Sequence, residues 1–376
     1  MSRLRELESL GQSIWLDYIS RDLLRSGELE QKISDDGLRG MTSNPSIFEK
    51  AVGGSNEYDA EIAELAAEGH DAAAVFDRLA IADVSAACDH FLPVYEESDG
   101  RDGYVSIEVS PHLAYDPDTT LSEARRLWAA VDRPNVMIKI PGTAEGMPAV
   151  HKALLEGINV NVTLLFAFDQ YLDVIETFIR ALEDRLEAGL PVDRCASVAS
   201  FFVSRVDTLV DKLLDEKADG ADEARKERLA ALHGKLGVAN SRIVYEHFAE
   251  VLAGDRWGRL AGAGAAPQRV LWASTSTKNP AYSDVLYVDE LIGPDTVNTL
   301  PQATYDAFKD HGTVARTVDK DLEAAHRHMD ELAAEGIDVK AATDKLLRDG
   351  VDLFIASFDE VIGIVGKRRD EVTAGA

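Results

Sequence analysis

Short apolar runs alternate with longer amphipathic stretches along most of the chain. Each run is rich in β-branched and aromatic residues and is bounded by glycine, proline or polar residues, a pattern that predicts buried strands. Eight such strands are expected at Ser13–Tyr18, Gly37–Thr42, Tyr104–Val109, Val136–Pro141, Ile158–Leu164, Ala196–Val203, Val270–Thr275 and Thr296–Leu300.

Apolar residues at helical spacing fill the segments between these strands. They predict helices at Tyr58–Ala67, Ala72–Leu92, Thr119–Val131, Met147–Glu156, Phe168–Ala188, Val203–Lys217, Asn240–Leu252 and Pro301–Lys309. The helix at Thr119 carries the spacing of a capping box, with Glu123 three positions after Thr120. Strands that alternate with helices of this length indicate parallel βαβ units. The sequence therefore predicts a (β/α)8 barrel, with a doubly wound open sheet as the alternative.

The remaining segments are interpreted as additions to one barrel domain spanning residues 1–376. A charge-rich helical insertion is expected around 215–268. Two long helical patterns, Asp319–Glu335 and Val339–Lys367, predict C-terminal helices around 317–372 that pack on the barrel.

Charge and composition narrow the range of ligands. The 376 residues include 39 basic and 67 acidic side chains, a formal net charge of −28. The electrostatic field of so acidic a chain repels nucleic acid and anionic lipid. A phosphate ligand would therefore require cationic side chains at the place where it binds. The two cysteines lie in apolar stretches without CxxC spacing, and no apolar run is long enough to cross a membrane, so we expect a cytoplasmic protein.

Lys139 interrupts the apolar run Val136–Pro141, where a buried charge is costly unless it is paired or used. Considered alone, it is best interpreted as a strand-end lysine that reaches solvent or pairs with a carboxylate. Burial also disfavours the ammonium form, and a neutral amine can attack a carbonyl. Glu108 and Asp17 interrupt two other predicted strands near their C-terminal ends, where barrel enzymes carry their chemistry. Two carboxylates in separate environments can divide the proton transfers that a lysine imine needs.

Uncharged polar groups stand at the ends of other predicted strands and suit the hydroxyls of a sugar. Asn161 and Thr163 alternate with apolar neighbours, so both face the barrel interior. Asn44, which follows Thr42 and precedes Pro45, is equally well explained as a turn residue.

Arg205 and Lys278 are the cations that a phosphate would require in so acidic a chain. Arg205 lies in the first turn of a predicted helix, close to Ser200, and Lys278 lies in a hydroxyl-rich loop beside Ser276. For either residue alone, a solvated surface charge is the commoner outcome. The chain has no nucleotide-binding glycine motif and no histidine spacing that suggests a metal site, so we expect neither a cofactor nor a metal.

Several segments, in a fixed order, resemble the transaldolase family, particularly its longer bacterial form. The similar segments are 40–48, 107–116, 138–143, 157–166, 200–207 and 272–280, and the resemblance runs from about Ser13 to Pro301. It implies a class I aldolase barrel and the transfer of a dihydroxyacetone unit from sedoheptulose 7-phosphate to glyceraldehyde 3-phosphate in the pentose phosphate pathway.

The resemblance also implies residue roles. Lys139 would form the Schiff base, Glu108 would act through water as acid and base, and Asp17 would take the proton that triggers cleavage. The other expected site residues are Asn44 and Asn161 for the dihydroxyacetone hydroxyls, Thr42 and Thr163 as supports for the carboxylates and water, and Ser200, Arg205, Ser276 and Lys278 for the substrate and its phosphate.

Lys278 departs from the family pattern, in which an arginine occupies this position of the phosphate loop. Lysine neutralises a phosphate but lacks the bidentate fork of arginine. Two alternatives stay open: release of free dihydroxyacetone, as in a fructose 6-phosphate aldolase, and a barrel that binds sugar phosphates without turnover. The sequence allows a monomer or a homodimer.

Overall fold

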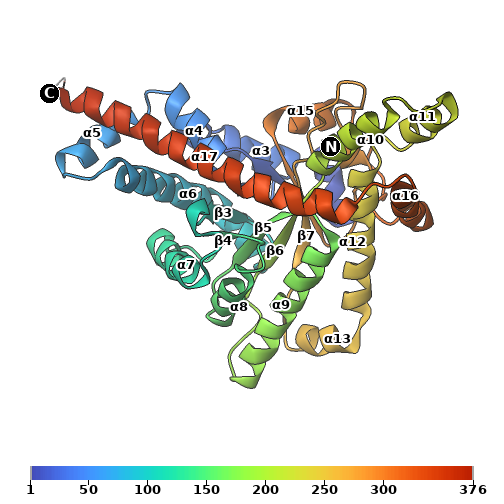
Figure 1. Cartoon of the computed structure of the whole chain (residues 1–376). Coiled ribbons are helices and arrows are strands. Elements are labelled where there is room, and N and C mark those ends of the chain that lie inside the picture. The colour runs from blue at the N-terminus through green and yellow to red at the C-terminus, as the bar shows by residue number, and fades with distance from the viewer. Residues whose placement is uncertain (1, 375–376) are drawn as a thin grey trace.

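The computed structural model describes residues 2–374 and shows a closed barrel of eight parallel strands in chain order (Figure 1). The strands are β1 (Gln12–Asp17), β2 (Gly40–Thr42), β3 (Tyr104–Glu108), β4 (Val136–Pro141), β5 (Val160–Leu165), β6 (Ser197–Phe202), β7 (Arg269–Ala273) and β8 (Thr296–Leu300). β8 pairs with β1, which closes the sheet and leaves no edge strand. The (β/α)8 prediction is confirmed, and the doubly wound alternative is wrong.

Every helix predicted between the strands is present, with ends shifted by a few residues. These helices are α5 (Asp59–Ala67), α6 (Ala72–Glu97), α7 (Pro117–Val131), α8 (Met147–Leu155), α9 (Phe168–Glu187), α10 (Ser204–Ala218), α12 (Leu236–Ala253) and α15 (Gln302–His311). The region of the predicted insertion also holds α11 (Glu223–Ala230) and α13 (Asp255–Gly262). Within the described residues, no helix is both long enough and apolar enough to cross a bilayer.

Four helices near the N-terminus were not predicted. They are α1 (Arg3–Glu6), α2 (Arg21–Arg25), α3 (Glu28–Asp36) and α4 (Pro45–Gly54). α2 spans too few residues to show a helical period, and α3 is mostly charged or polar with one buried leucine, Leu29. Short helices of this kind depend on tertiary packing, which hydrophobic spacing does not reveal.

The predicted capping box of α7 is wrong. The helix begins at Pro117, and the side chain of Asp116 caps it by accepting a 3.1 Å hydrogen bond from the Thr119 backbone N–H. Proline fits the first helical position because its missing N–H would have no partner there. Thr120 instead donates to the Leu113 carbonyl at 2.8 Å.

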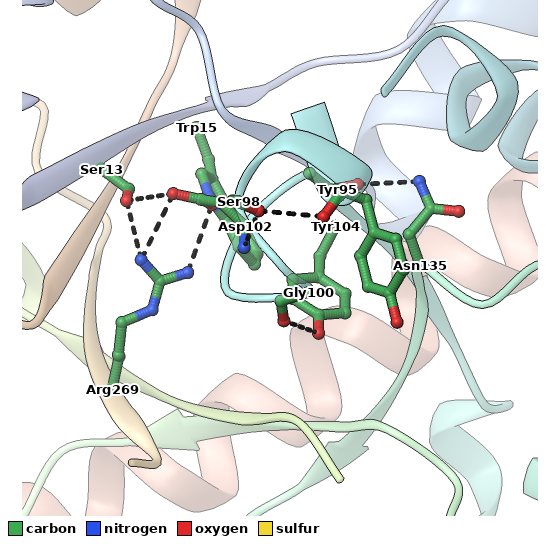
Figure 2. Close-up of polar contacts among 10 residues, drawn as sticks. Ser13, Trp15, Tyr95, Ser98, Gly100, Asp102, Tyr104, Asn135 and Arg269 are labelled. Atoms are coloured by element: carbon green, nitrogen blue, oxygen red, sulfur yellow. Dashed lines mark hydrogen bonds and ion pairs between the residues drawn. The ribbon is translucent and has the colours of Figure 1, made fainter. Parts of the chain in front are cut away.

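Aromatic and charged side chains close the N-terminal end of the barrel. Trp15 fills the interior beside Gly40, where a Cβ atom would lie 2.6 Å from the indole. The buried Asp102 accepts a 2.9 Å hydrogen bond from the Trp15 indole N–H and pairs with Arg269 at 3.2 Å (Figure 2). Ser13 donates to the same carboxylate and accepts from Arg269 at 2.7 Å. This network is structural, and it leaves the opposite end of the barrel for chemistry.

Two further helices follow the barrel, α16 (Leu322–Ala334) and α17 (Val339–Ala374). Figure 1 shows α17 in red running across the molecule from beside α10 to beside α5. It also packs against α4 and α6 and reaches the end of β5. Gly350 permits this approach, since a Cβ atom there would lie 3.2 Å from Leu164. The C-terminal helix therefore covers part of the barrel end at which β5 finishes.

Candidate active site

A cavity of about 370 Å³ lies at the C-terminal ends of the strands. Nine of the eleven predicted site residues line it: Asp17, Thr42, Asn44, Lys139, Thr163, Ser200, Arg205, Ser276 and Lys278. Glu108 and Asn161 are neighbours of this group but do not line the cavity. Parallel strands place their C-terminal residues at one mouth, and this geometry gathers side chains from distant parts of the sequence.

Lys139 is buried, with 6% of its side chain exposed. The neighbouring strands β3 and β5 place Glu108 and Asn161 on either side of it. Its Nζ donates to the Ser43 carbonyl at 3.3 Å and lies 3.8 Å from Glu108 Oε2. The amine is thus held by one backbone acceptor and one carboxylate, and it borders the cavity.

The Glu108 carboxyl group is buried beside Lys139. Only 5% of its side chain is exposed, and neither carboxyl oxygen has a hydrogen-bond partner within residues 2–374. Burial raises the pKa of Glu108 to about 7, a rise that the ammonium of Lys139 opposes and the Asp17 carboxylate adds to. A carboxyl group with a pKa near neutrality can both give and take a proton.

Asp17 ends β1 and lines the same cavity as Lys139. Burial raises the pKa of the Asp17 carboxyl above its ordinary value, although the Lys139 charge and a hydrogen bond from Thr42 oppose that rise. Thr42 Oγ1 donates to Asp17 Oδ1 at 2.7 Å and lies 2.7 Å from the Thr299 hydroxyl. Thr42 therefore orients the Asp17 carboxyl group.

Asn161 belongs to a buried hydrogen-bond network and has no surface in the cavity. Its Nδ2 donates to Ser106 Oγ at 3.0 Å, and its Oδ1 accepts from Ser200 Oγ at 2.6 Å. Ser200 does line the cavity. Thr163 lies two residues beyond Asn161 on β5 and lines the cavity. Its buried hydroxyl has no hydrogen-bond partner among the described residues.

A β-bulge follows Thr163. The pairing of β5 with β6 shifts register between Val162 and Leu165, and the intervening Leu164 has a φ of +61°. A non-glycine residue in this left-handed region is strained, and such strain persists only where the surrounding packing imposes it. Bulges next to active sites re-aim side chains, here at the position of Thr163.

Asn44 has a structural role at the start of a helix, where the sequence had suggested a turn residue. It is the N-cap of α4, and its side chain accepts a 3.1 Å hydrogen bond from the Ile47 N–H. The residue also lines the cavity, so its side-chain amide N–H groups face the site while the oxygen caps the helix.

Cations dominate the cavity wall. Lys50, Lys139, Arg205 and Lys278 line it together with one carboxylate, Asp17. Burial, Arg205 and Lys50 lower the pKa of Lys278, whose Nζ donates to Ser276 Oγ at 2.7 Å. Local positive charge inside a chain of net charge −28 is the condition that a phosphate ligand requires.

Sequence reasoning missed Lys50 and Phe354. Lys50 lies on α4, a helix that the hydrophobic pattern did not predict. Phe354 lies on α17, lines the cavity, and places its ring centroid 5.8 Å from Lys139 Nζ. Lys50 could have been suspected from the sequence because it follows the candidate residue Asn44 by only six positions. No neighbouring residue in the sequence indicates that Phe354 lies at the cavity.

This combination defines the class of protein. A closed (β/α)8 barrel with a buried lysine beside one carboxyl group, and in electrostatic contact with a second, at the C-terminal ends of its strands has the architecture of a class I aldolase. The chain belongs to the transaldolase/fructose-6-phosphate aldolase family, whose family model, described as Transaldolase/Fructose-6-phosphate aldolase, matches residues 14–364.

Similar proteins named transaldolase cover nearly the whole chain. The transaldolase of Trichodesmium erythraeum is 47% identical over 375 residues, which are 99% of each chain. That of Thermobifida fusca is 46% identical over 98% of each chain, and that of Mycolicibacterium paratuberculosis is 48% identical over 96% of this chain and 95% of its own. These relatives and the family support transaldolase function, which is that of a transferase.

Proposed function

We propose that the chain is a transaldolase of the non-oxidative pentose phosphate pathway. It moves a dihydroxyacetone unit from sedoheptulose 7-phosphate to glyceraldehyde 3-phosphate and yields erythrose 4-phosphate and fructose 6-phosphate. The observation that carries the proposal is the buried Lys139 amine, 3.8 Å from the Glu108 carboxyl and on the wall of a cation-lined cavity. No cofactor or metal enters the chemistry.

Lys139 is the nucleophile. Its neutral amine attacks the C2 carbonyl of the donor ketose, and Glu108, acting through water, supplies the proton with which the carbinolamine hydroxyl leaves as water. The resulting protonated imine accepts the electron pair released when the C3–C4 bond breaks. The pKa of about 7 at Glu108 supports this role, because the carboxylate left after dehydration can take the proton back in the hydrolytic step.

Asp17 takes the proton from the C4 hydroxyl as the C3–C4 bond breaks. It lines the same cavity as Lys139 and is oriented by the 2.7 Å hydrogen bond from Thr42. When the acceptor aldehyde arrives, the same group returns the proton to the new hydroxyl.

Amide and hydroxyl groups hold the dihydroxyacetone unit. Asn44 and Ser200 contact its hydroxyls directly, and Thr163 holds the water that Glu108 uses. Asn161 was expected to contact the substrate too. Its bonds to Ser106 and Ser200 favour an indirect role, in which it fixes the Ser200 hydroxyl.

Arg205, Lys278 and Lys50 bind the terminal phosphate, with Ser276 beside them. Lys50 supplies a third cation where Lys278 lacks the fork of an arginine. Three cations from α4, α10 and the loop after β7 can surround a phosphate without any one making a bidentate contact.

We also propose that the chain acts as one domain, as a monomer or homodimer, in the cytoplasm. The packing of α17 against α4, α5 and α6 supports the first point. Two buried free cysteines, Cys88 and Cys195, favour a reducing compartment.

Borohydride trapping tests the imine. Reduction in the presence of fructose 6-phosphate should leave a three-carbon adduct on Lys139, located by peptide mass spectrometry. Lys139→Ala should abolish both the adduct and transfer, and Lys152→Ala, at an exposed lysine outside the cavity, should change neither. An adduct on another residue, or normal transfer by Lys139→Ala, refutes the assignment.

A coupled assay separates the alternatives. Transfer from sedoheptulose 7-phosphate to glyceraldehyde 3-phosphate is expected to exceed release of free dihydroxyacetone. Predominant release would favour a fructose 6-phosphate aldolase, and binding without either product would favour a non-catalytic sugar-phosphate receptor.

A further inference from the structure

A second cavity, of about 290 Å³, reaches Glu108 from the side of the barrel. Its wall runs from the exposed Ala73 and Arg126 at the surface to Ser43, Ile107 and Glu108 inside. α4, α6, α7 and α17 contribute the lining, which includes the apolar Phe48, Phe76, Leu127 and Phe358. Glu108 borders this side cavity and does not border the substrate cavity.

Two residues separate the side cavity from the substrate cavity. Asn44 lines both, and Ser43, whose carbonyl accepts from Lys139 Nζ, lines the side cavity. Lys139 lines only the substrate cavity, so the 3.8 Å gap between its Nζ and Glu108 Oε2 is where the two spaces approach each other. Glu108 and Lys139 thus border different cavities.

The outer mouth of the side cavity carries net negative charge. Arg126 makes paired hydrogen bonds to Asp77 at 2.6 and 2.7 Å and to Glu123 at 2.7 and 2.8 Å. Two carboxylates against one guanidinium give a charge of −1 at the rim, which repels anionic sugar phosphates. The wall beyond the rim is largely apolar, so it suits single small, neutral water molecules better than a sugar with many hydroxyls.

We propose that the side cavity is the route by which the water released during imine formation leaves Glu108 and by which water returns for imine hydrolysis. The inference rests on the proposed function. In the forward step, the Glu108 carboxyl gives its proton, through a bound water molecule, to the carbinolamine hydroxyl and the C–O bond breaks. The products are a protonated imine, one released water molecule and the Glu108 carboxylate. In the reverse step, water adds to the imine carbon and Glu108 takes back the proton.

A separate water route has a use in this reaction. The substrate fills the front cavity, and Phe354 of α17 covers part of its mouth, so water made at Glu108 has no free path forward while the sugar is bound. The side cavity connects Glu108 with solvent without passing the imine of Lys139. Because the water route and the substrate route are separate, water can exchange at Glu108 while the substrate cavity stays closed to water.

The test follows one oxygen atom. Fructose 6-phosphate labelled with ¹⁸O at C2 reacts with erythrose 4-phosphate, and mass spectrometry measures the label in early sedoheptulose 7-phosphate. The donor oxygen leaves as water, and the oxygen of the product comes from the water that hydrolyses the imine. In the unmodified protein, exchange with solvent should remove nearly all of the label.

Ala74→Phe places a ring in the side cavity, since Ala74 lines it and is half-buried. Retained label should rise severalfold because the released water stays at Glu108 and is used again. Ala73→Phe, at the exposed end of the lining, gives a second obstruction that the fold tolerates more readily. Ala82→Phe is the matched control: it is exposed on the same helix, lies outside the lining, and should leave the label unchanged.

Borohydride trapping is measured on all the variants as a separate readout. Trapping at Lys139 with retained label only in Ala73→Phe and Ala74→Phe supports the route. Trapping at Lys139 with full washout in both variants overturns it, because water then leaves by the front mouth. Absence of the adduct in the unmodified protein refutes the proposed function itself.

Discussion

Replacing Glu108 by glutamine should stabilise the protein at alkaline pH while removing the acid that we propose for catalysis. The carboxyl lies buried without a hydrogen-bond partner within the described chain, 3.8 Å from Lys139. Burial penalises the ionised form, and the pKa rises from 4.5 to about 7 despite the nearby ammonium. Glutamine reproduces the size and neutrality of the protonated acid at every pH.

The magnitude follows from linkage between protonation and folding. The folded state binds the Glu108 proton more tightly than the unfolded chain, so its stabilising effect is complete below pH 4.5 and is lost as pH rises through about 7. A shift of about 2.5 units, at about 1.4 kcal/mol per unit, corresponds to about 3 kcal/mol. The free energy of unfolding of Glu108→Gln should therefore exceed that of the parent by about 3 kcal/mol at pH 8 and match it near pH 4.5.

Equilibrium urea unfolding at several values between pH 5 and pH 8 measures this difference. Glu187→Gln is the matched control, because Glu187 is exposed at the end of α9 and should give curves parallel to those of the parent. Curves for Glu108→Gln that also stay parallel to the parent across this range would show that the ionised carboxylate is well solvated. The account of Glu108 as a buried acid would then be wrong.

Three other substitutions test separate parts of the structure. Lys50→Ala should raise the KM for fructose 6-phosphate about fivefold and leave kcat unchanged, because the loss of one exposed charge pair costs about 1 kcal/mol of binding free energy. An unchanged KM would contradict a role of Lys50 in phosphate binding. Phe354→Ala should increase dihydroxyacetone release relative to transfer, measured in the coupled assay, because it opens the cavity mouth to water; an unchanged ratio shows that Phe354 does not screen the imine. Asp102→Ala leaves the Arg269 charge and the Trp15 N–H without their partner and should lower the free energy of unfolding by about 3 kcal/mol. Borohydride trapping at Lys139 should persist in Asp102→Ala below its unfolding transition, and its loss there would show that the two ends of the barrel are coupled.

The pattern of apolar and polar positions predicted the barrel, and the pairing of β8 with β1 excluded the open sheet that the pattern had left as the alternative. The central strands are buried on both faces and appear as compact apolar runs, and most of the long helices between strands have an apolar stripe. The same rule located most of the candidate site, since a polar residue at the end of such a run must lie at the C-terminal mouth. Lys139 and Asp17 were found in this way.

The sequence pattern failed where long-range packing sets the structure. It placed Asn161 inside the barrel but did not show that the side-chain amide of Asn161 is hydrogen-bonded to Ser106 and Ser200. It predicted α17 as a helix but did not place Phe354 over Lys139, because the helix is separated from β4 by almost 200 residues and its position depends on contacts with α4, α5 and α6.

The sequence by itself determined the strands, most of the helices and the candidate site residues, because burial and periodicity can be recognised from neighbouring residues. Only the tertiary structure decided which cavity each side chain faces. Glu108 on β3 and Lys139 on β4 are direct neighbours in the sheet, yet Glu108 lines the side cavity and Lys139 lines the substrate cavity. That division depends on the helices packed outside the barrel, whose positions are fixed by contacts between segments distant in the chain.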